Sequence, residues 1–500
     1  MKRIKYILAS IVVAALTLQS CSEDKMDDIN KNKNDPEFME SKYILTEVMT
    51  KTSFSVTGAD LAFYASIYTE LLGGSSAQFY NAQERLGEPA NSTTYNNQWN
   101  AIYINLRSLK FVEQKCSEGG EEAGNYHALG IAQILKAYNL AILTDLFGDV
   151  PYSEALEPLL NPQAKIDKQE DIYKAVFQLL DDGIANLAKK TEYADIGKQD
   201  LLYENGNVDS WTRAAHGLKA RYLMRLSAKS PDYQGVIDNV NKSFVHSSQD
   251  LYYQVSGVNY PFYSVYMARK GMFSSKTYYD LMKKLDPADP RLDDYFVKVG
   301  KDNPELVLIN HGEKVSQSQS IYSPSGLSYG TSSLLKNTTN AVYLMSYHEL
   351  LFLKAEAQAR LGIPEANATL QAAVDAGYLH KKQQFTYVRY VPKPNEPKPA
   401  NGYNRDLPTN LTGNDLLKRI AEEKYLSAFE VESIEMYNDI RRWKAMGENL
   451  IELQHKDPTK FPKRFAYGNS DVSNNPHVRA AYGDGSYVYT EDVWWAGGTR

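Results

Sequence analysis

The amino-acid sequence predicts a mostly α-helical protein built from tetratricopeptide-like pairs of antiparallel helices, with long irregular loops between some of them. Three observations carry this prediction. Apolar residues recur at helical spacing from about residue 42 to 230 and again from 342 to 445. Small residues stand where paired helices approach closely, although the tetratricopeptide repeat signature of about 34 residues is not met cleanly. Helical spacing is lost between about 230 and 340 and between 385 and 412.

The helices follow from apolar residues that fall on one side of a helical turn. The first pattern predicts a helix that ends near Phe147-Gly148-Asp149 and consists of Ile131, Ile134, Tyr138, Ala141 and Ile142. The second pattern comprises Ile172, Val176, Leu179, Leu180, Ile184 and Leu187. A third consists of Leu218, Tyr222 and Leu226. Residues 342–361 and 415–445 predict two further helices.

The irregular stretches are rich in Ser, Gly, Asn, Pro and Tyr, which favour turns and loops. Five prolines mark the second of them as a loop: Pro392, Pro394, Pro397, Pro399 and Pro408. The last 40 residues also look irregular. No linker separates two folds, so we expect a single domain over residues 41–500 with loop insertions at about 230–340 and 385–412. Long loops of this kind are usually functional or disordered.

The N-terminus has the pattern of a secretory signal peptide, residues 1–20. Basic residues precede an apolar run from Ile7 to Leu18, which is too short to span a membrane. The run ends at Leu18-Gln19-Ser20-Cys21, which resembles a bacterial lipobox, so Cys21 is the expected lipidation site. The alternative is an ordinary signal peptide with a chance cysteine. Residues 21–40 are expected to form a flexible tether behind the lipid.

Charge and composition exclude several classes of function. The net charge of -6 leaves no excess of positive charge for phosphates, so nucleic acid is not an expected partner. Acidic substrates are disfavoured for the same reason. The 37 tyrosines are an unusually large number, and tyrosine offers a flat apolar ring with a polar tip. Such side chains suit recognition of polar ligands with flat faces, or an amphipathic rim around helices.

Catalytic and metal-binding motifs are incomplete. Gly326–Gly330 matches G-x-S-x-G, but neither the strand before it nor the helix after it is predicted. His348-Glu349 begins an H-E-x-x-H pattern, yet Phe352 stands at the position of the second histidine. The aspartates near Pro287 and Pro290 fit a solvated turn better than a calcium site. Cys116 is expected to be an inert thiol. The sequence therefore predicts no enzyme activity, no metal and no cofactor.

Several separated segments resemble the SusD/RagB family of surface lipoproteins, in particular its SusD-like branch. They lie between about residues 145 and 495 in the family's order. The matching segments are Phe147–Ala155, Gly206–Trp211, Leu218–Ser227, Asp289–Leu292, Met345–Ala357, Glu423–Tyr425, Asn438–Trp443 and Val493–Trp495. We expect these segments to hold the fold rather than a ligand. Gly148 should take a positive φ, Glu423 could pair with Arg441 or Arg442, and Trp494 with Trp495 should fix the C-terminus.

The resemblance implies a substrate-binding lid over a SusC-like TonB-dependent β-barrel transporter. Such a protein is anchored by its lipid in the outer membrane, faces the cell exterior and binds oligosaccharides for import. The acidic stretch Ser22–Asp28 looks like the export signal of Bacteroidetes surface lipoproteins. The alternative is an oligopeptide-binding component of the same type of importer, because the RagB side of the family handles peptides.

Aromatic side chains in irregular segments are the candidate ligand-binding residues, because aromatic rings stack on sugar faces. The first cluster is formed by Phe79, Tyr80 and Tyr95. The second cluster is formed by Tyr260, Tyr263, Tyr266, Tyr322 and Tyr329.

Overall fold

The computed structural model describes residues 39–74, 77–86, 93–203, 206–254, 272–289, 291–292, 296, 306, 308, 310–313, 341–387, 405–429 and 431–500. The predicted signal peptide, Cys21 and most of the tether lie outside the described residues. The same is true of the Gly326–Gly330 motif and of the whole second aromatic cluster.

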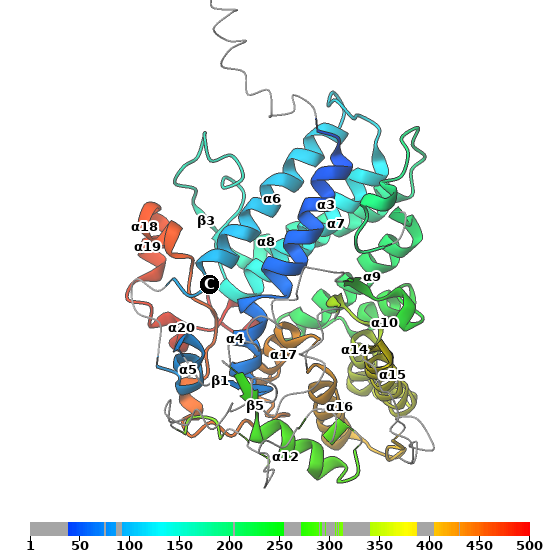
Figure 1. Ribbon diagram of the computed structural model, residues 1–500, viewed down its shortest axis with the longest axis vertical. Coiled ribbons are helices and arrows are strands. Elements are labelled where there is room, and N and C mark those ends of the chain that lie inside the picture. Colours follow the sequence, from blue (N-terminus) through cyan, green and yellow to red (C-terminus); the bar gives the residue numbers. More distant parts are fainter. Residues whose placement is uncertain are drawn as a thin grey trace, which may run out of the picture.

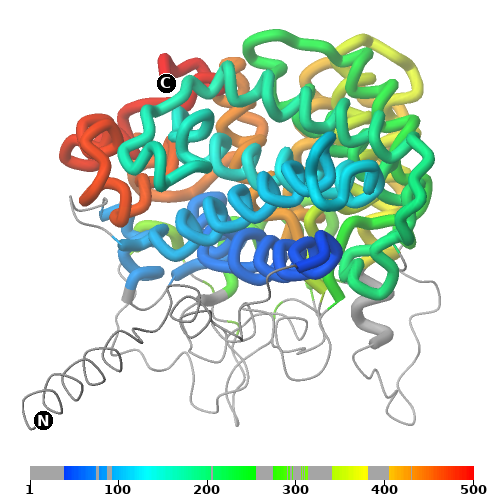
Figure 2. Tube along the Cα trace, turned by 90° about the horizontal axis from the view of Figure 1, so that it is seen from above, coloured from blue at the N-terminus to red at the C-terminus, as the bar shows by residue number. Residues whose placement is uncertain are grey.

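A succession of helices forms the larger part of the fold (Figure 1). These helices are α3 (Ser41–Lys51), α6 (Asn96–Cys116), α7 (Tyr126–Phe147), α8 (Gln169–Leu187), α9 (Val208–Arg225), α10 (Tyr233–Asn241), α14 (Tyr347–Leu361) and α15 (Ala366–Tyr387). Each packs against the next in this order. From above, α3, α6 and α7 run alongside one another, coloured blue to cyan (Figure 2). The predicted stacking of helices is confirmed.

A second group of helices closes the scaffold from below and brings distant parts of the chain together (Figure 1). It contains α4 (Asp60–Tyr68), α5 (Ala77–Glu84), α12 (Lys276–Leu285), α16 (Gly413–Ser427) and α17 (Ser433–Ala445). Helix α17 packs on α4, and α16 packs on both α14 and α15. Early and late segments of the chain therefore share one interior.

Three short antiparallel strand pairs complete the described structure. Strand β1 (Leu72–Gly74) pairs with β5 (Met272–Ser274), and β2 (Val150–Pro151) pairs with β3 (Ile166–Asp167). Strand β4 (Leu251–Tyr253) pairs with β6 (Val342–Met345). The described chain also contains the π-helix η1 (Thr52–Thr57) and the 3-10 helices Gly197–Gln199, Leu226–Ala228, Ser247–Gln249, Pro458–Lys460 and Trp494–Ala496.

Helix boundaries follow from local chemistry. The Asn125 side chain accepts from the Ala128 backbone N–H and begins α7, which ends at Gly148 with φ 83°. The Ser346 Oγ accepts from the Glu349 N–H at 3.1 Å and begins α14. Gly362 ends that helix in the left-handed conformation. The prediction of a positive φ at Gly148 is confirmed.

Several predicted boundaries are wrong. Helix α14 begins only at Tyr347, because Val342–Met345 form strand β6. The predicted helix at 415–445 is two helices, since α16 ends at Ser427 and α17 begins only at Ser433. The stretch at 230–340 contains α10 and α12, which are helices of only nine and ten residues. The C-terminal stretch contains the short helices α18 (Asn469–Asn474), α19 (Pro476–Tyr482) and α20 (Tyr487–Thr490).

One large apolar cluster extends from Ile44 to Ala496 and is crossed by buried ion pairs. Arg442 donates to both carboxylate oxygens of Glu356 at 2.8 and 2.7 Å, and Arg221 pairs with Glu349. The expected pairing of Glu423 with Arg441 or Arg442 is wrong, because Glu423 instead pairs with Arg405 and Arg419.

The C-terminal segment is held by a buried tryptophan, as predicted. Trp495 is fully buried, and its ring lies 4.7 Å from the Arg441 guanidinium and 5.5 Å from that of Arg225. Its backbone N–H donates to Oε1 of Gln169 at 3.1 Å. Trp494 is half-buried beneath the Lys229 ammonium. Cation–π contacts and burial thus fix this end of the chain.

Candidate ligand-binding site

The β4–β6 strand pair stands where two of the predicted ligand-binding segments begin or end. Strand β4 ends at Tyr253, and the next residues carry Tyr260, Tyr263 and Tyr266. Strand β6 begins at Val342, after the segment that carries Tyr322 and Tyr329. These five tyrosines lie outside the described residues. The strand pair nevertheless fixes the roots of both segments in one place.

Two aromatic pairs lie at these roots, one on each face of the strand pair, because consecutive strand residues point to opposite faces. We call their four rings the aromatic base: Phe54, Tyr252, Tyr253 and Tyr343. Tyr252 and Tyr343 are partners in the strand ladder, and their rings stack with centroids 5.3 Å apart. Phe54 meets Tyr253 edge to face at 5.1 Å. All four side chains are half-buried, so parts of their rings remain accessible. Planar rings with polar tips are suited to sugar faces and hydroxyl groups.

Phe54 is aimed at this place by the π-helix η1. The π-helix is a rare conformation that occurs frequently at functional sites. Buried polar side chains hold η1 in place, since the amide Nδ2 groups of Asn139 and Asn105 donate to the Thr52 hydroxyl at 3.0 and 3.2 Å. At the other end of η1, the Thr57 hydroxyl is hydrogen-bonded to that of Tyr138 at 3.0 Å. Sequence periodicity did not reveal this element.

A buried polar cluster lies beneath the stacked pair of Tyr252 and Tyr343. The Tyr343 ring packs on His380 at 4.4 Å, and His380 packs on His348 at 5.0 Å. Asp250 accepts from the Tyr347 backbone N–H at 2.7 Å, and its other oxygen lies 3.5 Å from Nδ1 of His380. Burial raises the pKa of Asp250 to about 8, so this carboxyl group is largely protonated at neutral pH. The cluster therefore supports the strand pair without adding a net negative charge.

The first predicted aromatic cluster is divided by the structure. Phe79 and Tyr80 lie on α5, and Tyr95 stands at the start of α6. Phe79 and Tyr95 are buried, and the Tyr95 ring stacks on Phe465 with centroids 4.5 Å apart. Both rings thus have positions in the core, whereas Tyr80 is half-buried and keeps accessible surface. The sequence pattern of aromatic residues among amide residues did not distinguish the buried rings from the accessible one.

The polar residues considered for metal binding have structural partners. Arg291 donates to Asp289, with Nη2 2.7 Å from Oδ2, and the Tyr378 hydroxyl donates to the same carboxylate at 2.8 Å. His348 is buried against α15. Within the described ranges, no group of three or more His, Cys, Asp or Glu side chains is arranged to hold a metal ion. The described helices also include none that is long and apolar enough to cross a membrane.

Helical pairs that carry an accessible aromatic base define a helical binding scaffold. The chain belongs to the SusD-like family: residues 33–468 match the family model described as "Starch-binding associating with outer membrane". This family consists of binding proteins without catalytic activity. The family resemblance and the mostly helical SusD-like fold are therefore confirmed.

Solved structures give the same result. A SusD/RagB family protein from Bacteroides thetaiotaomicron is 35% identical, with a TM-score of 0.79, and the match covers 93% of this chain and 100% of that one. A SusD-like protein from the same organism is 18% identical, with a TM-score of 0.71 and coverage of 92% and 99%. A chitin-binding SusD homologue from Flavobacterium johnsoniae is 20% identical, with a TM-score of 0.70 and coverage of 91% and 99%. The comparison with curated proteins finds no match.

Proposed function

We propose that the protein is a cell-surface lipoprotein that binds oligosaccharides and delivers them to a SusC-like TonB-dependent transporter. The observation that carries this proposal is the stacked pair of Tyr252 and Tyr343, half-buried at the roots of the predicted ligand-binding segments. The starch-binding description of the family and the chitin-binding homologue support a glycan as the ligand class. Association with the outer membrane follows from the family, and acylation of Cys21 supplies the anchor.

Ligand recognition combines rings from three parts of the chain. The aromatic base offers planes for sugar faces at the roots of the segments, and Tyr322 and Tyr329 belong to one of those segments. Tyr80 on α5 is the remaining accessible member of the first cluster. Amide and carboxylate groups near these rings take the sugar hydroxyl groups.

Isothermal titration tests the proposal. The protein is residues 21–500 with Cys21→Ser, titrated with malto-oligosaccharides, chito-oligosaccharides and a mixed oligopeptide digest. We expect heat from one glycan class. Heat from peptides alone would overturn the glycan assignment in favour of the oligopeptide alternative.

Variants then locate the site. Tyr343→Ala should weaken glycan binding about tenfold, which corresponds to about 1.4 kcal/mol. Tyr343→Phe keeps the ring and should bind nearly as well as the parent protein. Tyr193→Ala is the matched control, because Tyr193 is an exposed tyrosine on a different surface loop. If Tyr343→Ala and the control bind the glycan with equal affinity, the aromatic base is not part of the binding site.

A further inference from the structure

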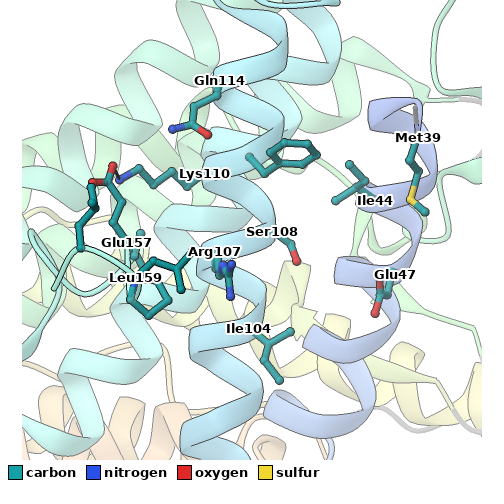
Figure 3. Close-up of a pocket in the computed structure, with 14 residues that line it drawn as sticks. Met39, Ile44, Glu47, Ile104, Arg107, Ser108, Lys110, Gln114, Glu157 and Leu159 are labelled. Atoms are coloured by element: carbon teal, nitrogen blue, oxygen red, sulfur yellow. Dashed lines mark hydrogen bonds and ion pairs between the residues drawn. The ribbon is translucent and has the colours of Figure 1, made fainter. Parts of the chain in front are cut away.

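An apolar groove runs across α6. It has a volume of about 650 Å³ and lies between the start of α3 on one side and residues 156–160 on the other (Figure 3). Eleven large hydrophobic side chains are exposed in the described part of the chain. Five of these line this one groove: Met39, Ile104, Phe111, Leu159 and Leu160. Clustering of this kind marks a surface that is covered by something else.

The leucine tip of the groove is presented by a fixed loop. Leu159 is 92% exposed and Leu160 is 74% exposed. The loop that carries them is closed by the β2–β3 pair, where Asp167 accepts from the Tyr152 backbone N–H at 2.8 Å. It is also tied to α6, because Lys110 pairs with Glu157 at 2.6 Å (Figure 3). The outward direction of the two leucines is therefore built into the fold.

The groove also carries a positive charge that the described residues leave unneutralised. Arg107 lines the groove on α6 and is exposed, and no acidic side chain in the described ranges forms an ion pair with it. The neighbouring charges are already paired, since Lys110 binds Glu157 and Glu47 binds Lys51. An apolar groove beside a free guanidinium matches a molecule with acyl chains and an anionic head group.

The groove begins close in sequence to the predicted lipidation site, which points to a membrane lipid as this molecule. Met39 lines the groove, and Cys21 lies only 18 residues before it. Even a fully extended chain of this length spans at most about 65 Å. An acyl anchor on Cys21 therefore keeps the edge of the groove close to the lipid, at a high effective concentration.

We propose that this groove is a lipid-docking face that lies against the membrane in which Cys21 is anchored. Leu159 and Leu160 enter the acyl region, and Arg107 binds the phosphate of an anionic lipid. The inference rests on the lipid anchor of the proposed function but not on the identity of the glycan. Docking of this face holds the body of the protein in one orientation relative to the membrane, which a single flexible anchor does not do.

Vesicle sedimentation tests the proposal on residues 21–500 with Cys21→Ser, so that no acyl group contributes. The vesicles contain phosphatidylcholine alone or mixed with phosphatidylglycerol. We expect binding to both and tighter binding to the mixture. The double variant Leu159→Asp/Leu160→Asp should lose binding at least tenfold, whereas Arg107→Ala should lose only the gain due to phosphatidylglycerol. Leu361→Asp is the control, because Leu361 is an exposed leucine on α14 outside the groove.

Unfolding midpoints confirm that each variant is folded, and glycan titration separates the two proposals. A double variant that still binds glycan but not vesicles supports the docking face. If the parent protein binds vesicles but no glycan, the proposed docking face is supported and the proposed glycan-binding function is overturned. Absence of vesicle binding by the parent protein overturns the docking face. If the double variant keeps vesicle binding but loses co-purification with the β-barrel, the groove binds a protein instead.

Discussion

Removal of the buried carboxylate of Glu356 should strongly destabilise the fold. Glu356 lies on α14 and accepts from both Nη groups of Arg442 at 2.8 and 2.7 Å, and from the Trp443 indole at 3.1 Å. It also accepts from Arg360 at 2.9 Å. Glu356 is 2% exposed and Arg442 is fully buried. Glu356→Gln keeps the shape of the side chain and removes its charge.

The expected magnitude follows from what remains around Arg442. Breaking a buried ion pair by removal of one partner costs about 3–5 kcal/mol. Arg442 keeps Asp439, whose Oδ1 lies 3.0 and 3.1 Å from its nitrogens, so we expect the lower end, about 3 kcal/mol. Glu448→Gln is the matched control. Glu448 binds the same Arg360 at 2.9 and 2.7 Å but is partly exposed, so its loss should cost at most about 1 kcal/mol.

Urea unfolding at several pH values measures both variants. Burial alone would raise the pKa of Glu356, but Arg442 and Arg360 hold it well below its ordinary value. The ionised carboxylate therefore contributes stability above a pH of about 4.5, and this contribution is lost as the pH falls towards the folded-state pKa. The difference between parent protein and Glu356→Gln should shrink over that range. Equal losses for Glu356→Gln and Glu448→Gln at neutral pH would refute the reasoning.

Three further predictions concern single sites. Gly148→Ala should cost about 1–3 kcal/mol, because φ is 83° and the new Cβ would lie 2.7 Å from Nη1 of Arg464; an unchanged urea midpoint would contradict this. For Asp250, burial raises the folded pKa to about 8, whereas the unfolded value is about 3.8. The folded state therefore holds a proton that the unfolded state loses, and the free energy of unfolding should fall as the pH rises from about 3.8 to about 8. Asp250→Asn should make this fall with pH less steep. An equally steep fall in the variant and the parent protein would contradict the prediction. Burial raises the pKa of Cys116 to about 11, so a thiol reagent should label Cys116 only on unfolding, and prompt labelling of the folded protein would show that it is accessible.

The long helices could be predicted because their periodicity is strong and their ends carry clear signals. Helix α8 is the best example, since its buried apolar residues share one side. Helix α7 is buried on nearly all sides, but Gly148 marks its end. Short elements were missed for a physical reason. Helix α10 has only nine residues and a single buried side formed by Val236, Ile237 and Val240. Its stability comes from packing against α9 and α14 rather than from its own pattern.

The candidate site was less predictable. Tyr252 and Tyr343 are 91 positions apart, and nothing in a single sequence reveals that β4 and β6 pair. The signal available was local, because tyrosine and β-branched residues in Leu251–Tyr253 and Val342–Met345 are typical of strands. Phe79 and Tyr95 could not be distinguished from surface rings, since their burial depends on Phe465 and other distant partners.

The buried ion pairs determine when the chain can fold. Arg221 forms an ion pair with Glu349, which follows it by 128 positions in the chain. Arg225 forms one with Glu435, which follows it by 210 positions. Until most of a chain that emerges N-terminus first has appeared, Arg221 lacks Glu349, and Arg225 has only Asp145 among its carboxylate partners. Burying them earlier would leave charges uncompensated, so the early helices gain no lasting closed state of their own. The interior of the protein therefore closes only when the last third of the chain arrives.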